Sequence, residues 1–203
     1  MALMSLRYIG PVDSEDGLLL FGDAATLRQW RGSDNEPAEI YRAETAIAAR
    51  HPGLSVSVGQ AAAVLWDIAG PGTVDVFVHR EDESLLLVRS WLEGDSVSGS
   101  DELAIVTSLA LLPSAASLPF AEVVVDCGTL ALFWPAEEGA CIRRAPGSAF
   151  TIDSEQTMTE SSAMVFPVAS GRYQCVHDEV TSKGGEARRC RLSRRIQDDT
   201  FSS

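Results

Sequence analysis

The side chain with the clearest potential for acid–base chemistry is His177, because two carboxylates, Asp178 and Glu179, follow it directly. A carboxylate that orients an imidazole forms half of a catalytic relay. The other two histidines, His51 and His79, end a predicted helix and a predicted strand. None of the three belongs to an H-E-x-x-H motif, and the sequence has no G-x-S-x-G elbow. Since a histidine beside acids is usually an ordinary surface residue, we expect a protein that is not an enzyme.

The sequence also lacks the patterns of metal sites and phosphate-binding loops. The acidic stretch 13–17 has carboxylates for calcium, but too few alternating ligands and no closing bidentate Glu. The glycine-rich stretches match neither the phosphate cradle nor the dinucleotide fingerprint. No C-x-x-C pair provides zinc-site spacing. We therefore expect no metal and no cofactor, and we expect four small, buried cysteines: Cys127, Cys141, Cys175 and Cys190.

The charge balance bears on partners. The chain has 16 basic and 29 acidic side chains and a net charge of −13, whereas a nucleic-acid binder needs a basic footprint for the phosphates. We expect neither nucleic acid nor a membrane as partner. Six of the basic side chains lie within residues 183–203. We interpret this cluster as a solvated strand and tail that pair with acids elsewhere in the chain, and contact with RNA or a membrane is the alternative.

The length of 203 residues and the hydrophobic content of 45% are typical of one or two globular domains. A single compact domain over residues 1–203 is the simpler interpretation. No apolar run approaches the roughly 20 residues of a membrane helix, and residues 1–7 lack the pattern of a signal peptide. We therefore expect a cytoplasmic protein.

Helix signals occur at three places. A short helix over residues 23–31 has Asp23 as a candidate cap and ends before Gly32, which suits the left-handed stop. A second helix over 37–47 has proline in its first turn and apolar residues at helical spacing. A third helix over 101–112 begins with two acids, which favour the positive end of the helix dipole.

Strand signals dominate the remainder, and the class we predict is α+β, sheet-dominated and mostly antiparallel, with about three helices. We expect an opening β-hairpin that turns at 13–17, a loop-rich segment over about 135–162 and a C-terminal hairpin within about 163–195. In the closing hairpin, Cys175 and Cys190 would lie nearly opposite each other. An exposed edge of that hairpin would permit a weak homodimer. The other predicted strands are 54–58, 62–66, 74–78, 85–91, 122–126 and 129–134.

The order of several short motifs resembles a known family. The motifs are Trp30-Arg31-Gly32, Tyr41-Arg42-Ala43, the strand end Leu87-Val88-Arg89-Ser90-Trp91, the stretch 132–139 (LFWPAEEG) and a closing Gly171-Arg172-Tyr173. Over about residues 5–195, this order resembles the bacterial polymorphic-toxin immunity proteins catalogued as immunity protein 21. The family's W-x-G motif matches Trp30 and Gly32. The first turn here is longer and more acidic than the glycine-rich turn expected of the family, and tryptophan stands at 134 where an aspartate is usual.

The resemblance implies a non-catalytic protein that binds a cognate toxin domain and blocks it. Acidity fits this role, because many toxin domains are nucleases with basic clefts and charge complementarity speeds encounter. The alternative class is a small-ligand-binding or regulatory module, which needs a roomy apolar pocket. We expect a monomer or weak homodimer whose partner is a toxin domain. The predicted contact carboxylates are Asp13, Glu15, Asp16, Asp34, Glu36, Glu81, Asp82 and Glu83, and we assign a structural role to Trp30 and Gly32.

Overall fold

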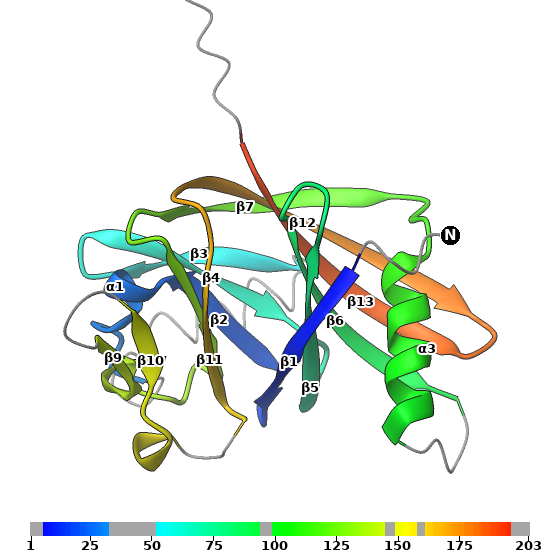
Figure 1. Ribbon diagram of the computed structural model, residues 1–203, viewed down its shortest axis with the longest axis horizontal. Coiled ribbons are helices and arrows are strands. Elements are labelled where there is room, and N and C mark those ends of the chain that lie inside the picture. The colour runs from blue at the N-terminus through cyan, green and yellow to red at the C-terminus, as the bar shows by residue number, and fades with distance from the viewer. Residues whose placement is uncertain (1–5, 33–51, 94–98, 145–148, 158–160, 196–203) are drawn as a thin grey trace, which may run out of the picture.

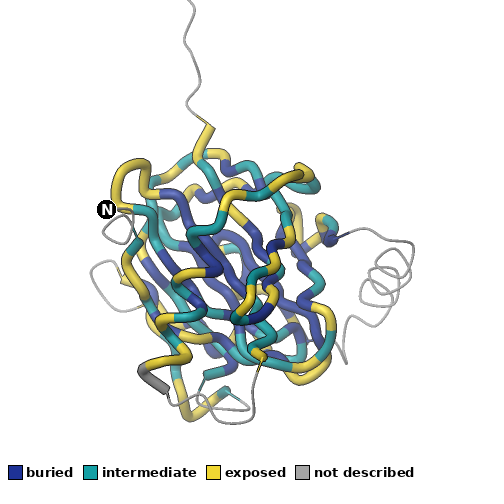
Figure 2. The backbone as a smooth tube through the Cα atoms, turned by 90° about the vertical axis from the view of Figure 1, so that its right-hand side faces the viewer, coloured by how far each residue is buried: buried dark blue, intermediate teal, exposed yellow. Residues whose placement is uncertain are grey.

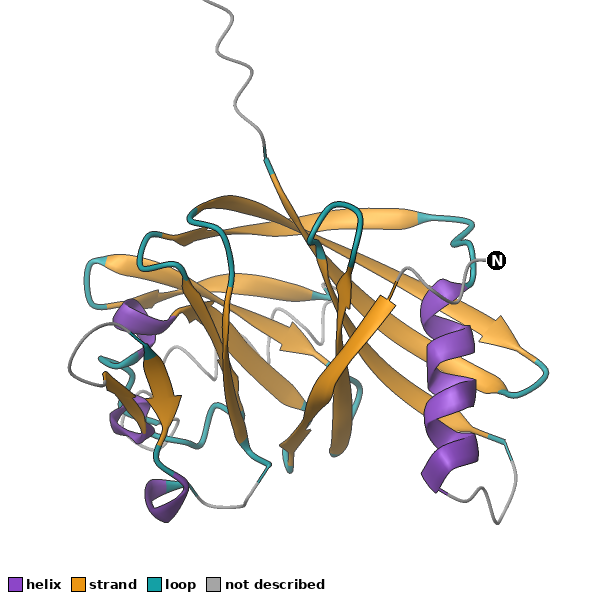
Figure 3. Cartoon of the chain, viewed as in Figure 1, coloured by secondary structure: helices purple, strands orange, loops and turns teal. Residues whose placement is uncertain are grey.

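The computed structural model describes residues 6–32, 52–93, 99–144, 149–157 and 161–195. This part of the chain is dominated by antiparallel β-strands, as expected (Figure 1). Its elements are arranged in layers, with two main sheets in the middle and helices outside them (Figure 3). None of its helices is long and apolar enough to cross a membrane.

Two antiparallel sheets face each other across the main core. The larger sheet contains, in spatial order, β1 (Leu6–Ser14), β5 (Gly72–His79), β6 (Leu85–Leu92), β13 (Gly185–Arg194), β12 (Gly171–Ser182) and β7 (Ser117–Val125). The smaller contains β11 (Ala163–Pro167), β8 (Thr129–Phe133), β2 (Leu18–Asp23), β4 (Ala61–Asp67) and β3 (Gly53–Val58). In strands such as β5 and β3, apolar and polar residues alternate along the sequence. Because successive side chains point to opposite faces of a sheet, these strands place their apolar residues toward one layer.

The predicted opening hairpin is wrong. The turn at 13–17 joins β1 to β2, but β1 pairs with β5 while β2 pairs with β4 and β8 in the other sheet. The turn therefore carries the chain between the sheets. β7 and β8 behave in the same way, because the tight Cys127-Gly128 link joins strands of different sheets. Every residue of β2 is buried, since both faces of its sheet are covered.

Three apolar clusters hold the layers together, and the buried segments run through the middle of the molecule (Figure 2). The largest lies between the sheets and includes Trp66 and Phe21 from the smaller sheet and Leu87 from the larger. A second covers the outer face of the smaller sheet, and a third lies between the larger sheet and its helix. Burial of side chains from both faces of each sheet explains why so many strands carry long apolar runs.

Two α-helices fall within the described residues. The short α1 (Ala24–Leu27) is capped by Asp23, whose carboxylate accepts from the Thr26 amide. The longer α3 (Gly99–Leu111) packs on the outer face of the larger sheet. These correspond to the first and third predicted helices. The predicted helix over 37–47 lies outside the described residues, as does the Tyr41-Arg42-Ala43 motif.

The segment over about 135–162, which we expected to be rich in loops, contains several short elements. A short 3-10 helix, η2 (Gly139–Cys141), leads into β9 (Ile142–Arg144), which pairs with β10 (Phe150–Ile152). A second 3-10 turn, η3 (Ser154–Gln156), follows. These elements cover the outer face of the smaller sheet through buried Ile142 and Phe150. The sequence signal was weak because each strand has only three residues.

The C-terminal hairpin is confirmed, with β12 and β13 joined by a tight turn at Lys183-Gly184. Both strands lie inside the sheet, flanked by β7 and β6, so the hairpin does not offer the free edge that dimerisation would use. Cys190 pairs with His177 and lies one diagonal step from Cys175. Both cysteines are buried and free.

Candidate functional site

The two acidic turns predicted to bind a partner lie far from each other. β1 and β5 are antiparallel, with Leu6 opposite His79 and Ser14 opposite Gly72. The turn that carries Glu15 and the turn that carries Glu81 therefore stand at opposite ends of this pair. At about 3.3 Å per residue along β1, they are roughly 26 Å apart. A partner would have to span that length to contact both turns at once.

Three of the predicted carboxylates accept hydrogen bonds from groups of the fold itself. Asp13 accepts from the Thr73 hydroxyl at 2.6 Å. Asp16 Oδ1 accepts from the Leu18 amide, and Asp82 Oδ1 accepts from the Ser84 amide. The remaining described carboxylates are exposed, and within the described ranges they make no hydrogen bond: Glu15, Glu81 and Glu83. Asp34 and Glu36 lie outside the described residues.

Trp30 and Gly32 of the W-x-G motif both contact the loop that follows β8. Trp30 is buried against the smaller sheet, and its indole N–H donates to the Pro135 carbonyl at 2.8 Å. The Trp30 carbonyl in turn accepts from the Gly139 amide. Gly32 has a φ of +81°, and a Cβ there would lie 2.9 Å from the Ala136 carbonyl oxygen. The motif therefore fixes the end of α1 to the loop that follows β8.

The strongest candidate site arises where the larger sheet extends past the smaller. On the inner face of β12, burial decreases from Cys175 to His177 and then to the exposed Glu179. On β13 it decreases in the same direction, from buried Cys190 through Arg188 to exposed Glu186. The end of β4 marks the border, because Trp66 belongs to the core between the sheets. Polar side chains on β12 and β13 therefore stand beyond the core.

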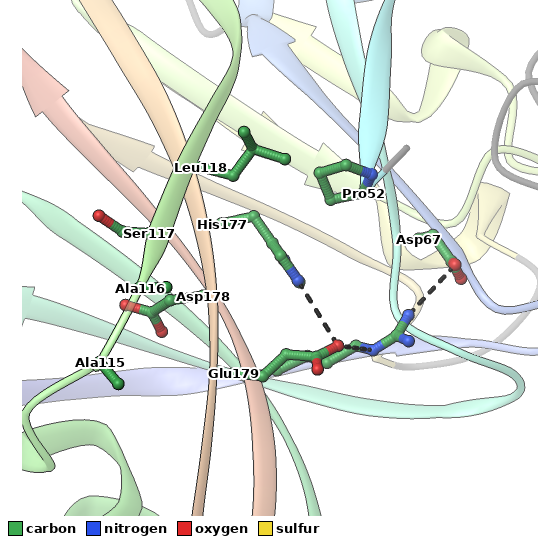
Figure 4. Close-up of a pocket in the computed structure, with 10 residues that line it drawn as sticks. Pro52, Asp67, Ala115, Ala116, Ser117, Leu118, His177, Asp178 and Glu179 are labelled. Atoms are coloured by element: carbon green, nitrogen blue, oxygen red, sulfur yellow. Dashed lines mark hydrogen bonds and ion pairs between the residues drawn. The ribbon is translucent and has the colours of Figure 1, made fainter. Parts of the chain in front are cut away.

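A groove of about 770 Å³ lies at this border. It is open to solvent and is formed by the end of β4, the start of β7, β12 and β13 (Figure 4). In Figure 4, Pro52 and Leu118 lie on one side and Glu179 on the other. Its lining residues are Pro52, Asp67, Ala115, Ala116, Ser117, Leu118, His177, Asp178, Glu179 and Arg188.

His177 is held from both ring nitrogens. The Trp66 indole N–H donates to its Nδ1 at 3.3 Å, so that nitrogen carries a lone pair and the proton of the neutral ring is on Nε2. Nε2 lies 3.7 Å from Glu179 Oε1. Burial lowers the pKa of His177, and Arg188 acts in the same direction, against the neighbouring carboxylates Glu179 and Asp178. The imidazole is therefore a neutral, positioned group at neutral pH.

One guanidinium is shared by two carboxylates beside this histidine. Arg188 Nε lies 2.9 Å from Glu179 Oε1, and its Nη1 donates to Asp67 Oδ2 at 3.2 Å. The other Asp67 oxygen accepts from the Ala69 amide. Glu179 Oε2 has no hydrogen-bond donor within the described parts of the chain. The Asp67–Arg188–Glu179 group therefore has one excess negative charge and one available acceptor.

The groove does not assemble a serine relay. Ser117 of β7 pairs with Asp178, whereas His177 pairs with Leu118, so Ser117 and His177 face opposite sides of the sheet. Figure 4 shows the Ser117 hydroxyl pointing away from the imidazole. Asp178 does not orient the imidazole, because both of its carboxylate oxygens bind Arg189. The acids beside His177 in the sequence are thus divided between two faces of β12.

A second hollow of about 340 Å³ continues along the inner face of the larger sheet. It shares Glu179 and Arg188 with the groove and adds Trp91 and Glu186. At the other end of the groove, Leu118 is 53% exposed, which is unusual for a large apolar side chain in this molecule. Exposed apolar side chains at a polar rim are a common feature of protein contact surfaces.

Sequence reasoning considered His177, Asp178 and Glu179 but missed Asp67, Leu118 and Arg188 as their neighbours. Asp67 and Leu118 come from strands far away in the chain, and Asp67 is 121 residues from Arg188. Arg188 lies opposite Glu179 in the C-terminal hairpin, so the register of that hairpin is the signal that could have found it. No family model, no curated protein and no solved structure matches this chain.

Proposed function

We propose that this chain is a non-catalytic protein that binds a bacterial toxin domain and neutralises it by forming a direct complex. The observation that carries the binding role is the open groove, which combines carboxylates in excess of cations with an exposed leucine on its wall. Such a surface suits a basic protein partner, because an apolar centre with a charged rim is the usual anatomy of an interface.

The toxin assignment rests on the order of motifs that resembles the immunity protein 21 family. The described motif residues support it through their structural roles, since Trp30 and Gly32 join α1 to the loop after β8. The net charge of −13 also supports it, because an acidic protein attracts the basic cleft of a nuclease-type toxin. Effective protection requires a Kd near nanomolar, about −12 kcal/mol.

The state of His177 favours binding over turnover. Its Nδ1 is occupied by the Trp66 indole and its Nε2 faces Glu179, which is itself bonded to Arg188. A general base needs a ring nitrogen within reach of the substrate proton. Here the imidazole connects the core to the ion-pair group and shapes the groove wall.

The experiment uses the tagged full-length chain as bait in lysate from its own source cells. We expect stoichiometric recovery of the C-terminal domain of a large secreted protein. Expression of that domain alone should then arrest growth of a test host, and co-expression of this chain should restore it. An empty bait with the toxin shown to be present, or arrest that co-expression does not relieve, would contradict the proposal.

A small-ligand-binding module is the second candidate, and the groove volume of about 770 Å³ favours it because ligand pockets occupy a similar range. Native mass spectrometry of the freshly purified protein distinguishes the two. A retained small molecule that the H177Q variant releases would support the ligand-binding module and argue against the toxin complex.

A further inference from the structure

We infer that the groove receives one arginine side chain of the protein partner, with the guanidinium at Glu179 and the aliphatic stem against Leu118 and Pro52. The inference rests on the proposed function for the identity of the partner. Its chemistry rests on the groove alone, and it moves the expected contact from the two acidic turns to the border between the sheets.

The charge balance of the groove favours the binding of one cation. Asp67 and Glu179 share the single guanidinium of Arg188, and the third carboxylate, Asp178, is neutralised by Arg189 on the other face. His177 adds no positive charge while its Nδ1 accepts from Trp66. One more cation would leave the group electrically balanced, so that its burial under a partner would leave no uncompensated charge.

The geometry supplies an acceptor with a fixed position. Glu179 is 60% exposed, but its Oε1 is held by Arg188 at 2.9 Å and faces His177. These contacts restrict the carboxylate, and Oε2 is left as the acceptor for an incoming donor. Because the side chain is already ordered, a partner loses less conformational entropy on binding to it.

The walls suit arginine because its stem and its head have different chemistry. Leu118 and Pro52 provide apolar contact on the side of the groove opposite Glu179 (Figure 4). Arginine buries its methylene stem along apolar surface while its head reaches a carboxylate. Truncation of Leu118 should therefore weaken binding without altering charge.

The test is an NMR titration of the ¹⁵N-labelled full chain with a blocked Gly-Arg-Gly peptide. The control peptide has neutral citrulline in place of arginine and nearly the same shape. We expect saturable shifts of the Trp66 indole N–H and of the Leu118 and Glu179 amides with the arginine peptide, and none that saturate with citrulline. Equal responses to both peptides, or shifts centred on the Glu15 and Glu81 turns, would overturn the inference.

Two variants and one matched control complete the experiment. E179Q keeps the size of the side chain and an acceptor for Arg188, and L118S removes the apolar wall. Each should weaken the arginine peptide about tenfold, which corresponds to about 1.4 kcal/mol. E81Q removes the same charge at the far end of β1 and should bind like the unaltered chain. Circular dichroism confirms that each variant is folded before it is titrated.

The same variants separate this inference from the proposed function. If a captured toxin domain binds E179Q and L118S as tightly as the unaltered chain, the groove assignment fails while toxin binding stands. If no toxin domain is captured but the arginine peptide binds as expected, the toxin assignment fails and the groove remains a cation site.

Discussion

Arg189 on β13 and Asp178 on β12 form a two-pronged ion pair across neighbouring strands, with Nε–Oδ1 at 2.5 Å and Nη2–Oδ2 at 3.0 Å. The remaining nitrogen, Nη1, donates to three carbonyl oxygens at the end of α3, those of Leu109, Ala110 and Leu112. One buried guanidinium therefore joins two strands to the helix that covers them. Arginine suits this position because its donors form a fixed fork.

Replacement of Arg189 by methionine should destabilise the fold strongly. The side chain is 3% exposed, so the change leaves Asp178 without its cation and the carbonyls at the end of α3 without their donor. Breaking a buried pair in this way costs about 3–5 kcal/mol. Urea unfolding of R189M gives the free energy directly.

The control for R189M is R191M, because Arg191 follows two residues later on β13 and is exposed. Its loss should change the free energy of unfolding by no more than about 0.5 kcal/mol. Similar losses in both variants would show that the position of Arg189 against α3 is not what stabilises the protein.

The fold was predictable from sequence where the signal was local. Alternation identified the strand now seen as β3, and two acids at the start of a helical segment identified α3. The prediction of an opening hairpin failed because a short polar turn has the same sequence pattern in both cases, whether the next strand pairs with the previous one or crosses to another sheet. The informative signal was the unbroken apolar run Leu18–Phe21, which indicates a strand covered on both faces rather than half of a solvated hairpin.

Substitution of Gly32 by alanine should destabilise the protein by about 3 kcal/mol. Its φ of +81° costs an L-residue about 1–2 kcal/mol, and the new Cβ would lie 2.9 Å from the Ala136 carbonyl oxygen. Gly70 provides a matched control, since its φ is +94° and nothing lies within 4 Å of a Cβ there. G70A should therefore lose only the backbone term, as urea unfolding would show.

The G32A variant also distinguishes a structural role of the W-x-G motif from a direct contact with the partner. If Gly32 acts only in the fold, folded G32A should bind the proposed toxin partner as tightly as the unaltered chain when both are assayed below the unfolding transition. A loss of affinity larger than the loss of folded fraction would instead place the motif in the interface.

His177 should make stability depend on pH. Its pKa in the fold is lowered by burial, so the unfolded chain binds a proton more readily than the folded chain as the pH falls below about 6.5. Stability is therefore complete above that value and decreases below it, by at most about 1.4 kcal/mol per pH unit. H177Q has no proton to gain, and its amide oxygen can still accept from Trp66.

Urea unfolding at about pH 7.5 and about pH 5.5 tests this dependence. The unaltered chain should lose more stability between the two values than H177Q does. NMR of the ring nitrogens provides an independent check, because the Trp66 contact requires an unprotonated Nδ1. A protonated Nδ1 at neutral pH, or equal losses in both proteins, would be inconsistent with the assigned state.

The candidate site was less predictable than the fold, because it joins residues that only the register brings together. His177, Asp178 and Glu179 are adjacent in sequence, yet alternation sends Asp178 to the α3 side and the other two to the groove. Asp67 reaches them from β4, far away in the chain, whereas Arg188 lies opposite Glu179 on the neighbouring strand of the same hairpin. The one readable signal was the basic cluster at 183–203, whose predicted pairing with acids is confirmed for Arg188, Arg189 and Arg195.

Charge reversal at the two acidic turns should have unequal effects on binding of the proposed toxin partner. The turn that carries Glu15 touches the loop after β4, since the Ile68 amide donates to the Gly17 carbonyl at 2.9 Å, and Asp67 of that region lines the groove. The turn that carries Glu81 stands at the other end of β1 and β5. E15K should slow association by about threefold and reduce its salt dependence, because rim charges act mainly on the rate of encounter. E81K should change neither the association rate nor its salt dependence, and both variants should keep their thermal stability because both glutamates are exposed.

Surface plasmon resonance against the captured domain of the proposed toxin partner, at low and high salt, measures the association and dissociation rates. A larger effect of E81K would place the partner at the opposite end of the molecule, and no effect of either variant would exclude both turns from the contact.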